Sequence, residues 1–265
     1  MLKGLAPGVW AHVVDVEGFP TASVVVLISR LALVVDTLSG PAQVAPVADF
    51  VASEAGGRRV VVVNTHHHWD HVFGNGAFAG ADIVAQRACP GLIEAQLRDG
   101  DESSRRPPPG GVPLPRVVFG DRLTYEDACG DVHLLHAPGH SEDSLAVFLP
   151  ESRLLLGGDA VEWPLPDFCR RGGAGEWIRT LRRLRRFAAD RIVPAYGPVM
   201  DSGVVDADER SIAGVYRAVA AAKSSGVSRD ALDLPVERFL AEGVVVDDVY
   251  AAVHRENLLW AWDEV

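Results

Sequence analysis

The chain of 265 residues has little cysteine, no long apolar run and no excess of positive charge. Its three cysteines, Cys89, Cys129 and Cys169, lie far apart and form no Cys-x-x-Cys pair, which excludes a disulfide framework and a zinc knuckle. The formal net charge of −11 disfavours a broad nucleic-acid-binding face, because such faces are basic. We therefore expect a small-molecule substrate and no nucleic-acid partner.

The sequence also shows no apolar segment typical of a membrane span or of a signal peptide. No apolar run approaches the roughly 20 residues that a membrane span needs. The first residues, Met1 to Pro7, lack the apolar core of a signal peptide. These features predict a cytoplasmic protein with no membrane partner, and they leave the oligomeric state open.

The distribution of apolar residues is that of a globular protein that alternates strands and helices. Hydrophobic residues make up 48% of the chain and charged residues 23%, enough for a substantial core. Two β-branched runs, 23–28 and 31–35, predict a hairpin of buried strands. Further expected elements are helices at 41–55, 176–189, 208–223 and 247–262, and strands at 60–63, 116–119, 132–135, 145–149, 154–156 and 191–193.

Histidine is concentrated in one short segment. Four of the nine histidines fall at His66, His67, His68 and His71, directly after a predicted strand. Residues i and i+2 of an extended segment project to the same side, so that His66 and His68 can converge on one ion while His67 points away. Asp70 and His71 can serve a second ion beside it, because imidazole and carboxylate are suitable zinc or iron ligands. The alternative is a histidine-rich surface loop without metal.

Polar side chains follow three further predicted strands after a few residues, at His140, Asp159 and Tyr196. Loops at one edge of a sheet thus supply polar groups together, which is how α/β enzymes generally build their sites. A turn or helix-cap role is the alternative for Asp159, since Gly-Gly-Asp is also common in turns.

The segment after Asp159 carries aromatic residues close to these polar groups. Trp163, Phe168 and Arg170 are expected to overhang the site, where the aromatic rings would form an apolar wall for a substrate. The alternative is that Trp163 and Phe168 only anchor the loop by packing.

The order of three motifs resembles that of the metallo-β-lactamase superfamily over most of residues 10–200. The motifs are His66-x-His68-x-Asp70-His71, Pro138-Gly139-His140-Ser141 and Gly157-Gly158-Asp159. The resemblance implies an α/β fold, a four-layer αββα sandwich. We expect the family domain to span residues 1–203 and a C-terminal helical extension, 204–265, to pack on the same domain.

The resemblance also implies two neighbouring metal positions. It places three histidines on the first metal, two further side chains on the second, and one carboxylate between the two; these are His66, His68 and His140, then Asp70 and His71, then Asp159. The cofactor implied is zinc, as one or two ions, with iron as the alternative.

One position departs from the family pattern. The family usually completes the second metal site with a histidine in a Pro-Gly-His-Gly segment, whereas this chain reads Pro194-Ala195-Tyr196-Gly197. A neutral phenol, with a pKa of about 10, is a poor ligand unless the metal drives its deprotonation. We interpret Tyr196 as an oxyanion donor, with metal ligation and simple packing as alternatives. The number and the identity of the metal ions stay open.

Together these features predict a hydrolase that cleaves an ester, thioester, lactone or lactam bond of a small molecule by metal-activated hydroxide. Asp70 would orient the nucleophile or pass on its proton, and Tyr196 would stabilise the oxyanion. One alternative is a non-hydrolytic metal enzyme, either a polyketide-type cyclase or thioesterase or a mononuclear iron dioxygenase. Another is a binding or regulatory protein with a degraded metal site. Fold does not determine substrate, so the substrate is not predicted.

Overall fold

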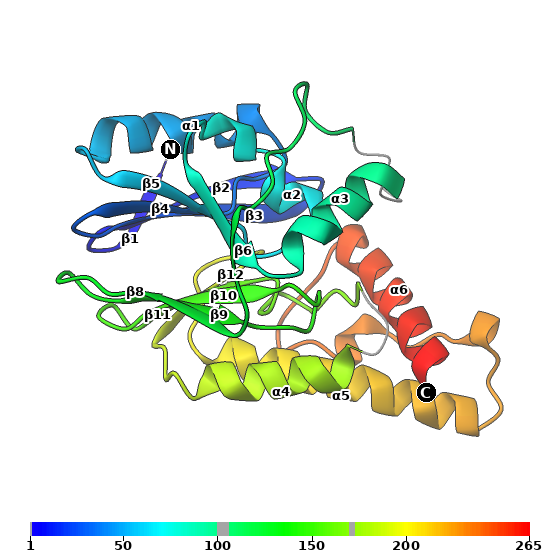
Figure 1. Cartoon of the computed structure of the whole chain (residues 1–265). Coiled ribbons are helices and arrows are strands. Elements are labelled where there is room, and N and C mark those ends of the chain that lie inside the picture. Colours follow the sequence, from blue (N-terminus) through cyan, green and yellow to red (C-terminus); the bar gives the residue numbers. More distant parts are fainter. Residues whose placement is uncertain (1, 100–105, 170–172) are drawn as a thin grey trace.

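Two β-sheets face each other in the computed structural model, which describes residues 2–99, 106–169 and 173–265. Helices cover the outer face of each sheet, with α1 above the first and α4 and α5 below the second (Figure 1). The four-layer αββα arrangement that the motifs implied is therefore confirmed.

The first sheet has seven strands in the spatial order β1-β2-β3-β4-β5-β6-β7. Its first four strands pair antiparallel and its last four pair parallel. The strands are β1 (Lys3–Ala6), β2 (Val9–Val16), β3 (Phe19–Leu27), β4 (Leu31–Val35), β5 (Arg59–Val63), β6 (Asp82–Gln86) and β7 (Val117–Phe119).

The second sheet has five strands in the order β12-β11-β10-β9-β8. Only β11 and β12 pair parallel, and the other neighbours are antiparallel. The strands are β8 (Arg122–Tyr125), β9 (Val132–His136), β10 (Leu145–Leu149), β11 (Leu154–Gly158) and β12 (Arg191–Pro194).

The helices agree in position with the apolar periodicity of the sequence. They are α1 (Pro41–Glu54), α2 (Trp69–Val72), α3 (Cys89–Asp99), α4 (Ala174–Arg185), α5 (Gly203–Ser224) and α6 (Asp248–Glu264), with short 3₁₀ helices at Asn75–Ala77, Arg229–Ala231 and Val236–Arg238. The sequence analysis predicted α1, α4, α5 and α6 near these positions. It did not predict β1, β2, β6, β8, α2 or α3. β2 mixes polar and apolar residues, and its position is set by pairing along its whole length with β3.

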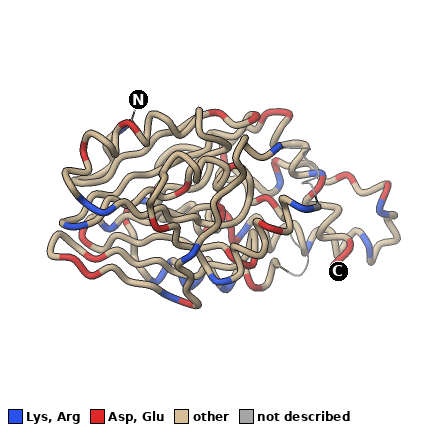
Figure 2. The backbone as a smooth tube through the Cα atoms, turned by 45° about the horizontal axis from the view of Figure 1, so that its top comes forward, with Lys and Arg blue, Asp and Glu red and all other residues tan. Residues whose placement is uncertain are grey.

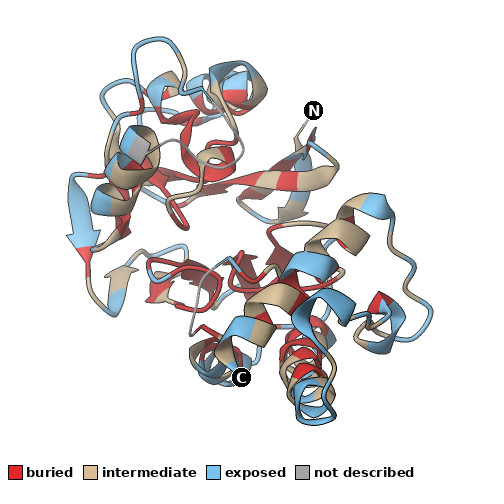
Figure 3. Ribbon diagram, turned by 90° about the vertical axis from the view of Figure 1, so that its right-hand side faces the viewer, coloured by how far each residue is buried: buried red, intermediate tan, exposed pale blue. Residues whose placement is uncertain are grey.

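The core lies in the spaces between the layers. Alternate residues of β4 point to opposite faces of the sheet, so that Ala32 and Val34 pack toward α1 while Leu33 and Val35 face the second sheet. Buried positions accordingly concentrate in the strands and on the inner sides of the helices (Figure 3).

The C-terminal helices share the core of the second sheet. Ile212 of α5 and Leu258 of α6 belong to the same buried cluster as Leu135 and Leu155 of the sheet. The division of the chain at residue 203 stays a prediction. Within the described residues, no helix combines the length and the apolar character needed to cross a membrane.

Candidate metal centre

The ends of four strands bring the predicted polar residues to one edge of the sandwich. His66 and His68 follow β5, His140 follows β9, Asp159 follows β11 directly, and Tyr196 follows β12. Because the strands are buried and rigid, the loops after them start from fixed points.

Three of the histidines and one aspartate converge on a single point. His66, His68, His140 and Asp159 each offer one ligand atom, and these atoms all lie within 4.8 Å of one another. His68 Nδ1 lies 2.9 Å from His66 Nε2 and 3.0 Å from His140 Nε2. Three imidazole nitrogens and one carboxylate oxygen make up a donor set that suits zinc or iron.

The remaining predicted residues gather on the other side of Asp159. His71 Nε2 lies 3.2 Å from Asp159 Oδ1 and 3.4 Å from Asp70 Oδ2. The Tyr196 hydroxyl is within donating distance of two carboxylates, at 2.9 Å from Asp159 Oδ2 and 3.2 Å from Asp70 Oδ2. His71 Nε2 and Asp159 Oδ1 are buried, and neither makes a hydrogen bond within the described part of the chain. A cation between these atoms would satisfy both.

The electrostatic environment favours a metal ion. Burial, reinforced by the neighbouring histidines, holds the pKa of His66 and His68 well below the usual range, which leaves them as neutral donors. Burial also lowers the pKa of His71, but Asp159, Asp70 and Asp36 outweigh it and raise that pKa well above normal. The same carboxylates that attract a proton attract a metal cation in its place.

Tyr196 keeps its proton in this environment. Burial, together with Asp159 and Asp70, raises the pKa of the Tyr196 phenol well above its ordinary value. Burial by itself raises the pKa of Asp70, but the adjacent His71 outweighs it and the net shift is downward. The hydroxyl is therefore a hydrogen-bond donor between two carboxyl groups rather than a ready-made anionic ligand.

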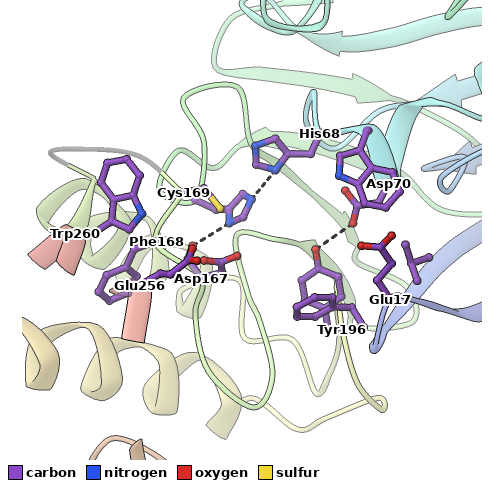
Figure 4. Close-up of a pocket in the computed structure, with 13 residues that line it drawn as sticks. Glu17, His68, Asp70, Asp167, Phe168, Cys169, Tyr196, Glu256 and Trp260 are labelled. Atoms are coloured by element: carbon purple, nitrogen blue, oxygen red, sulfur yellow. Dashed lines mark hydrogen bonds between the residues drawn. The ribbon is translucent and has the colours of Figure 1, made fainter. Parts of the chain in front are cut away.

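A cavity of about 500 Å³ opens above the cluster. Its lining includes four of the predicted site residues, His68, Asp70, His140 and Tyr196. The other described lining residues are Val16, Glu17, Phe19, Trp69, Asp167, Phe168, Cys169, Glu256 and Trp260 (Figure 4). The predicted overhang is present only in part. Phe168 lines the cavity, whereas Trp163 packs against the core of the second sheet and Arg170 lies outside the described residues.

The family of the chain follows from comparison with known proteins. A sequence model of the Metallo-beta-lactamase superfamily matches residues 16–196. The chain belongs to this superfamily. A metallo-beta-lactamase from Pontibacter korlensis shares the fold, with a TM-score of 0.63 at 21% sequence identity over 78% of this chain and 95% of that one.

The chain is also similar to parts of longer curated proteins whose names give different activities. The linear primary-alkylsulfatase of a Pseudomonas species is 28% identical over 178 residues, which cover 51% of this chain and 34% of that protein. The hydroxyacylglutathione hydrolase of Rhodospirillum rubrum is 32% identical over 135 residues, or 50% of this chain and 45% of the relative. The chain thus spans less than half the length of either relative.

Two buried carboxylates support the superfamily motif and were not identified from the sequence. Asp36, the residue after β4, receives His71 Nδ1 at 2.9 Å and the Thr65 backbone amide at 2.7 Å. Asp143 lies 2.8 Å from Nδ1 of His67, which is thereby turned away from the cluster as expected. Asp36 follows a strand end as the site residues do, and that signal was present in the sequence.

Glycine is required in the Pro-Gly-His motif because of the buried ring of Trp177. A Cβ added to Gly139 would lie 2.3 Å from Trp177 Cγ, and Trp177 is 2% exposed. We expect Gly139→Ala to lower the free energy of unfolding by about 1–3 kcal/mol, the usual cost of overpacking. Urea unfolding of the metal-free protein measures it.

Gly175 of α4 provides the matched control, since an added Cβ there meets its nearest atom, of Arg179, at 3.6 Å. Gly175→Ala should leave stability unchanged or raise it by up to about 1 kcal/mol. Equal unfolding curves for the two alanine variants would show that the Trp177 contact does not constrain the motif.

Proposed function

We propose that the chain is a metal-dependent hydrolase that cleaves an ester, thioester, lactone or lactam bond of a small molecule. One observation carries the proposal: four ligand atoms within 4.8 Å of one another, on residues that line or lie beneath a cavity of about 500 Å³. A cavity of that size is in the usual range for small-molecule sites.

The residues divide between holding the metal and handling the substrate. His66, His68, His140 and Asp159 would hold an ion, which when bound lowers the pKa of water to about 7 and polarises a carbonyl group. Asp70 lies at the cavity wall as a carboxylate of lowered pKa, and we assign to it the acceptance of a proton. Tyr196 would donate its O–H to an oxyanion.

We infer that the first metal position is occupied more tightly than the second. The second group offers Asp70, His71 and Asp159, and its remaining member is a protonated phenol that is hydrogen-bonded to both aspartates. This same feature favours a second candidate, a non-hydrolytic enzyme that works with one metal ion. Such an enzyme would be a cyclase with zinc or a dioxygenase with iron.

Metal analysis and substrate screening together test the proposal. The protein is purified without added metal, its zinc and iron are counted, and it is assayed on matched carboxylic esters, thioesters, lactones, β-lactams and sulfate esters before and after chelation. We expect one zinc per chain and hydrolysis that chelation abolishes. One iron per chain, with oxygen consumption and no hydrolysis, would support the second candidate instead.

The cavity also has a charge preference that can be measured. The described lining residues include four carboxylates and no lysine or arginine; the carboxylates are Glu17, Asp70, Asp167 and Glu256. Figure 2 shows Lys and Arg along the backbone as well as Asp and Glu, so this preference rests on the residues that line the cavity. We therefore expect higher kcat/KM for a substrate that ends in an ammonium group than for its matched carboxylate.

Glu256→Gln should lower the ratio of kcat/KM for the ammonium substrate to kcat/KM for the carboxylate substrate about two- to fivefold. This is the effect expected of an exposed charge worth up to about 1 kcal/mol. Glu151→Gln is the matched control, because Glu151 lies in the turn between β10 and β11, away from the lining residues. A preference for the carboxylate substrate in the parent protein would refute this prediction.

A further inference from the structure

Glu162 is a buried carboxylate beside the first metal position that neither the motifs nor the cavity identify. It lies in the loop after β11, three residues beyond Asp159, and is 1% exposed. Its Oε1 lies 2.9 Å from His140 Nδ1, and its Oε2 accepts the backbone amide of Asp167 at 2.7 Å. Oε2 is therefore hydrogen-bonded, whereas Oε1 is a buried acceptor that lies beside the ring and makes no hydrogen bond within the described residues.

The two ring nitrogens of His140 face different surroundings. Nε2 faces the cluster, at 3.0 Å from His68 Nδ1 and 3.5 Å from Asp159 Oδ2. Nδ1 faces Glu162 and the backbone carbonyl of Asp167, the latter at 3.1 Å. A neutral imidazole that binds a metal through one nitrogen carries its hydrogen on the other. An acceptor at that second nitrogen fixes both the tautomer and the orientation of the ring.

The loop that carries Glu162 is held by the C-terminal helices. The Glu162 backbone amide donates to Asp208 Oδ2 of α5 at 3.0 Å. Asn257 of α6 accepts the Phe168 amide at 2.8 Å and donates to the Pro166 carbonyl at 2.7 Å. Both helices lie beyond residue 196, where the superfamily match ends. The support of this loop therefore comes from the part of the chain that the superfamily match does not include.

We propose that Glu162 is a positioning residue for the metal centre. It holds Nε2 of His140 toward the metal in two ways: its Oε1 lies beside Nδ1, and its Oε2 fixes the backbone of Asp167, whose carbonyl accepts the Nδ1 hydrogen. Helices α5 and α6 hold Glu162 in place through Asp208 and Asn257. The inference rests on the proposed metal site. Desolvating a carboxylate this deeply buried is costly. A metal ion on Nε2 would make the Nδ1–H of His140 a stronger donor, and its attraction to Glu162 would then offset more of that cost.

The test measures metal affinity and the metal-free fold separately. Zinc affinity is determined by chelator competition for the parent, Glu162→Gln and Glu162→Asp, and the absorption spectrum is recorded for each with cobalt in place of zinc. Glu162→Gln should weaken zinc binding about 10- to 100-fold and alter the cobalt spectrum. Its metal-free form should unfold at or above the temperature of the parent, because a neutral amide replaces the buried carboxyl group without the cost of desolvating a charge. Glu162→Asp keeps the charge but is one methylene too short, so we expect the affinity to fall there too.

Two variants on the C-terminal helices complete the test. Asn257→Ala should weaken zinc binding several-fold, whereas Glu209→Gln, one residue from Asp208 and paired with Arg182, should not. Parental affinity and spectrum in Glu162→Gln would overturn the inference, and parental affinity in Glu162→Asp would show that charge rather than position matters. Parental zinc affinity in Asn257→Ala would show that the C-terminal helices do not help to position Glu162. A parent protein that binds no metal at all would overturn the proposed function instead.

Discussion

Replacing His66 or His140 with alanine is expected to abolish metal binding at the first position and to lower turnover by orders of magnitude. Each side chain supplies one of three imidazole nitrogens there, and both are almost completely buried. Loss of one imidazole leaves the metal with too few protein ligands, and a water molecule would have to take the place of the missing ring. Metal content per chain and steady-state kinetics on the best substrate measure the effect.

The control for these variants is a histidine at the end of β9, the strand that precedes His140, and outside the cluster. His136 ends β9, and its Nε2 lies 2.8 Å from the Glu142 carbonyl. His136→Ala should keep full metal content and nearly full turnover. Full metal content with unchanged turnover in His66→Ala or His140→Ala would mean that the cluster is not the metal centre.

Tyr196→Phe is expected to reduce turnover by up to about 10²–10³-fold while metal content stays constant, the loss typical of an oxyanion donor. The substitution removes only the hydroxyl that lies 2.9 Å from Asp159 Oδ2 and 3.2 Å from Asp70 Oδ2. Because burial and these carboxylates keep the phenol protonated, we expect a donor and not a phenolate ligand. Parallel metal titration separates the roles, since loss of a ligand would lower occupancy of the second position.

Tyr196→His tests the same position in the opposite direction. A neutral imidazole binds metal without the cost of deprotonating a phenol, so this variant should bind a second zinc more tightly than the parent does. If Tyr196→Phe matches the parent in metal content and in turnover, Tyr196 only fills space. If Tyr196→His gains no affinity, the geometry rather than the phenol limits the second position.

Much of the site could be predicted because its signals are local. His66 and His68 are two residues apart in an extended segment, and their ring centroids lie 4.5 Å apart. The same reasoning placed His67 away from the cluster, where Asp143 receives it. The rule that a polar residue follows a strand end located His140 and Asp159, since the strands themselves were recognisable as apolar runs.

The contacts that the supporting carboxylates make could not be predicted in this way. Asp36 and His71 are 35 positions apart, and Glu162 contacts His140 only because the loop after β11 folds back under the C-terminal helices. Asp36 does follow a strand end, but nothing near it in the sequence shows that His71 is its partner, and Glu162 carries no such signal. β2 was likewise missed, because its strand conformation depends on its pairing with β3.

The sequence by itself determined the class of fold and the types of side chain that gather at one edge of the sandwich, because strand periodicity and motif spacing are short-range properties of the chain. Tertiary structure alone decided which of these ligands meet within 4.8 Å, that the Tyr196 hydroxyl lies between two carboxylates, and that α6 supplies part of the cavity wall. These features are contacts between segments remote in sequence. Their distances depend on how the two sheets and the helices α5 and α6 pack, and no local pattern encodes that packing.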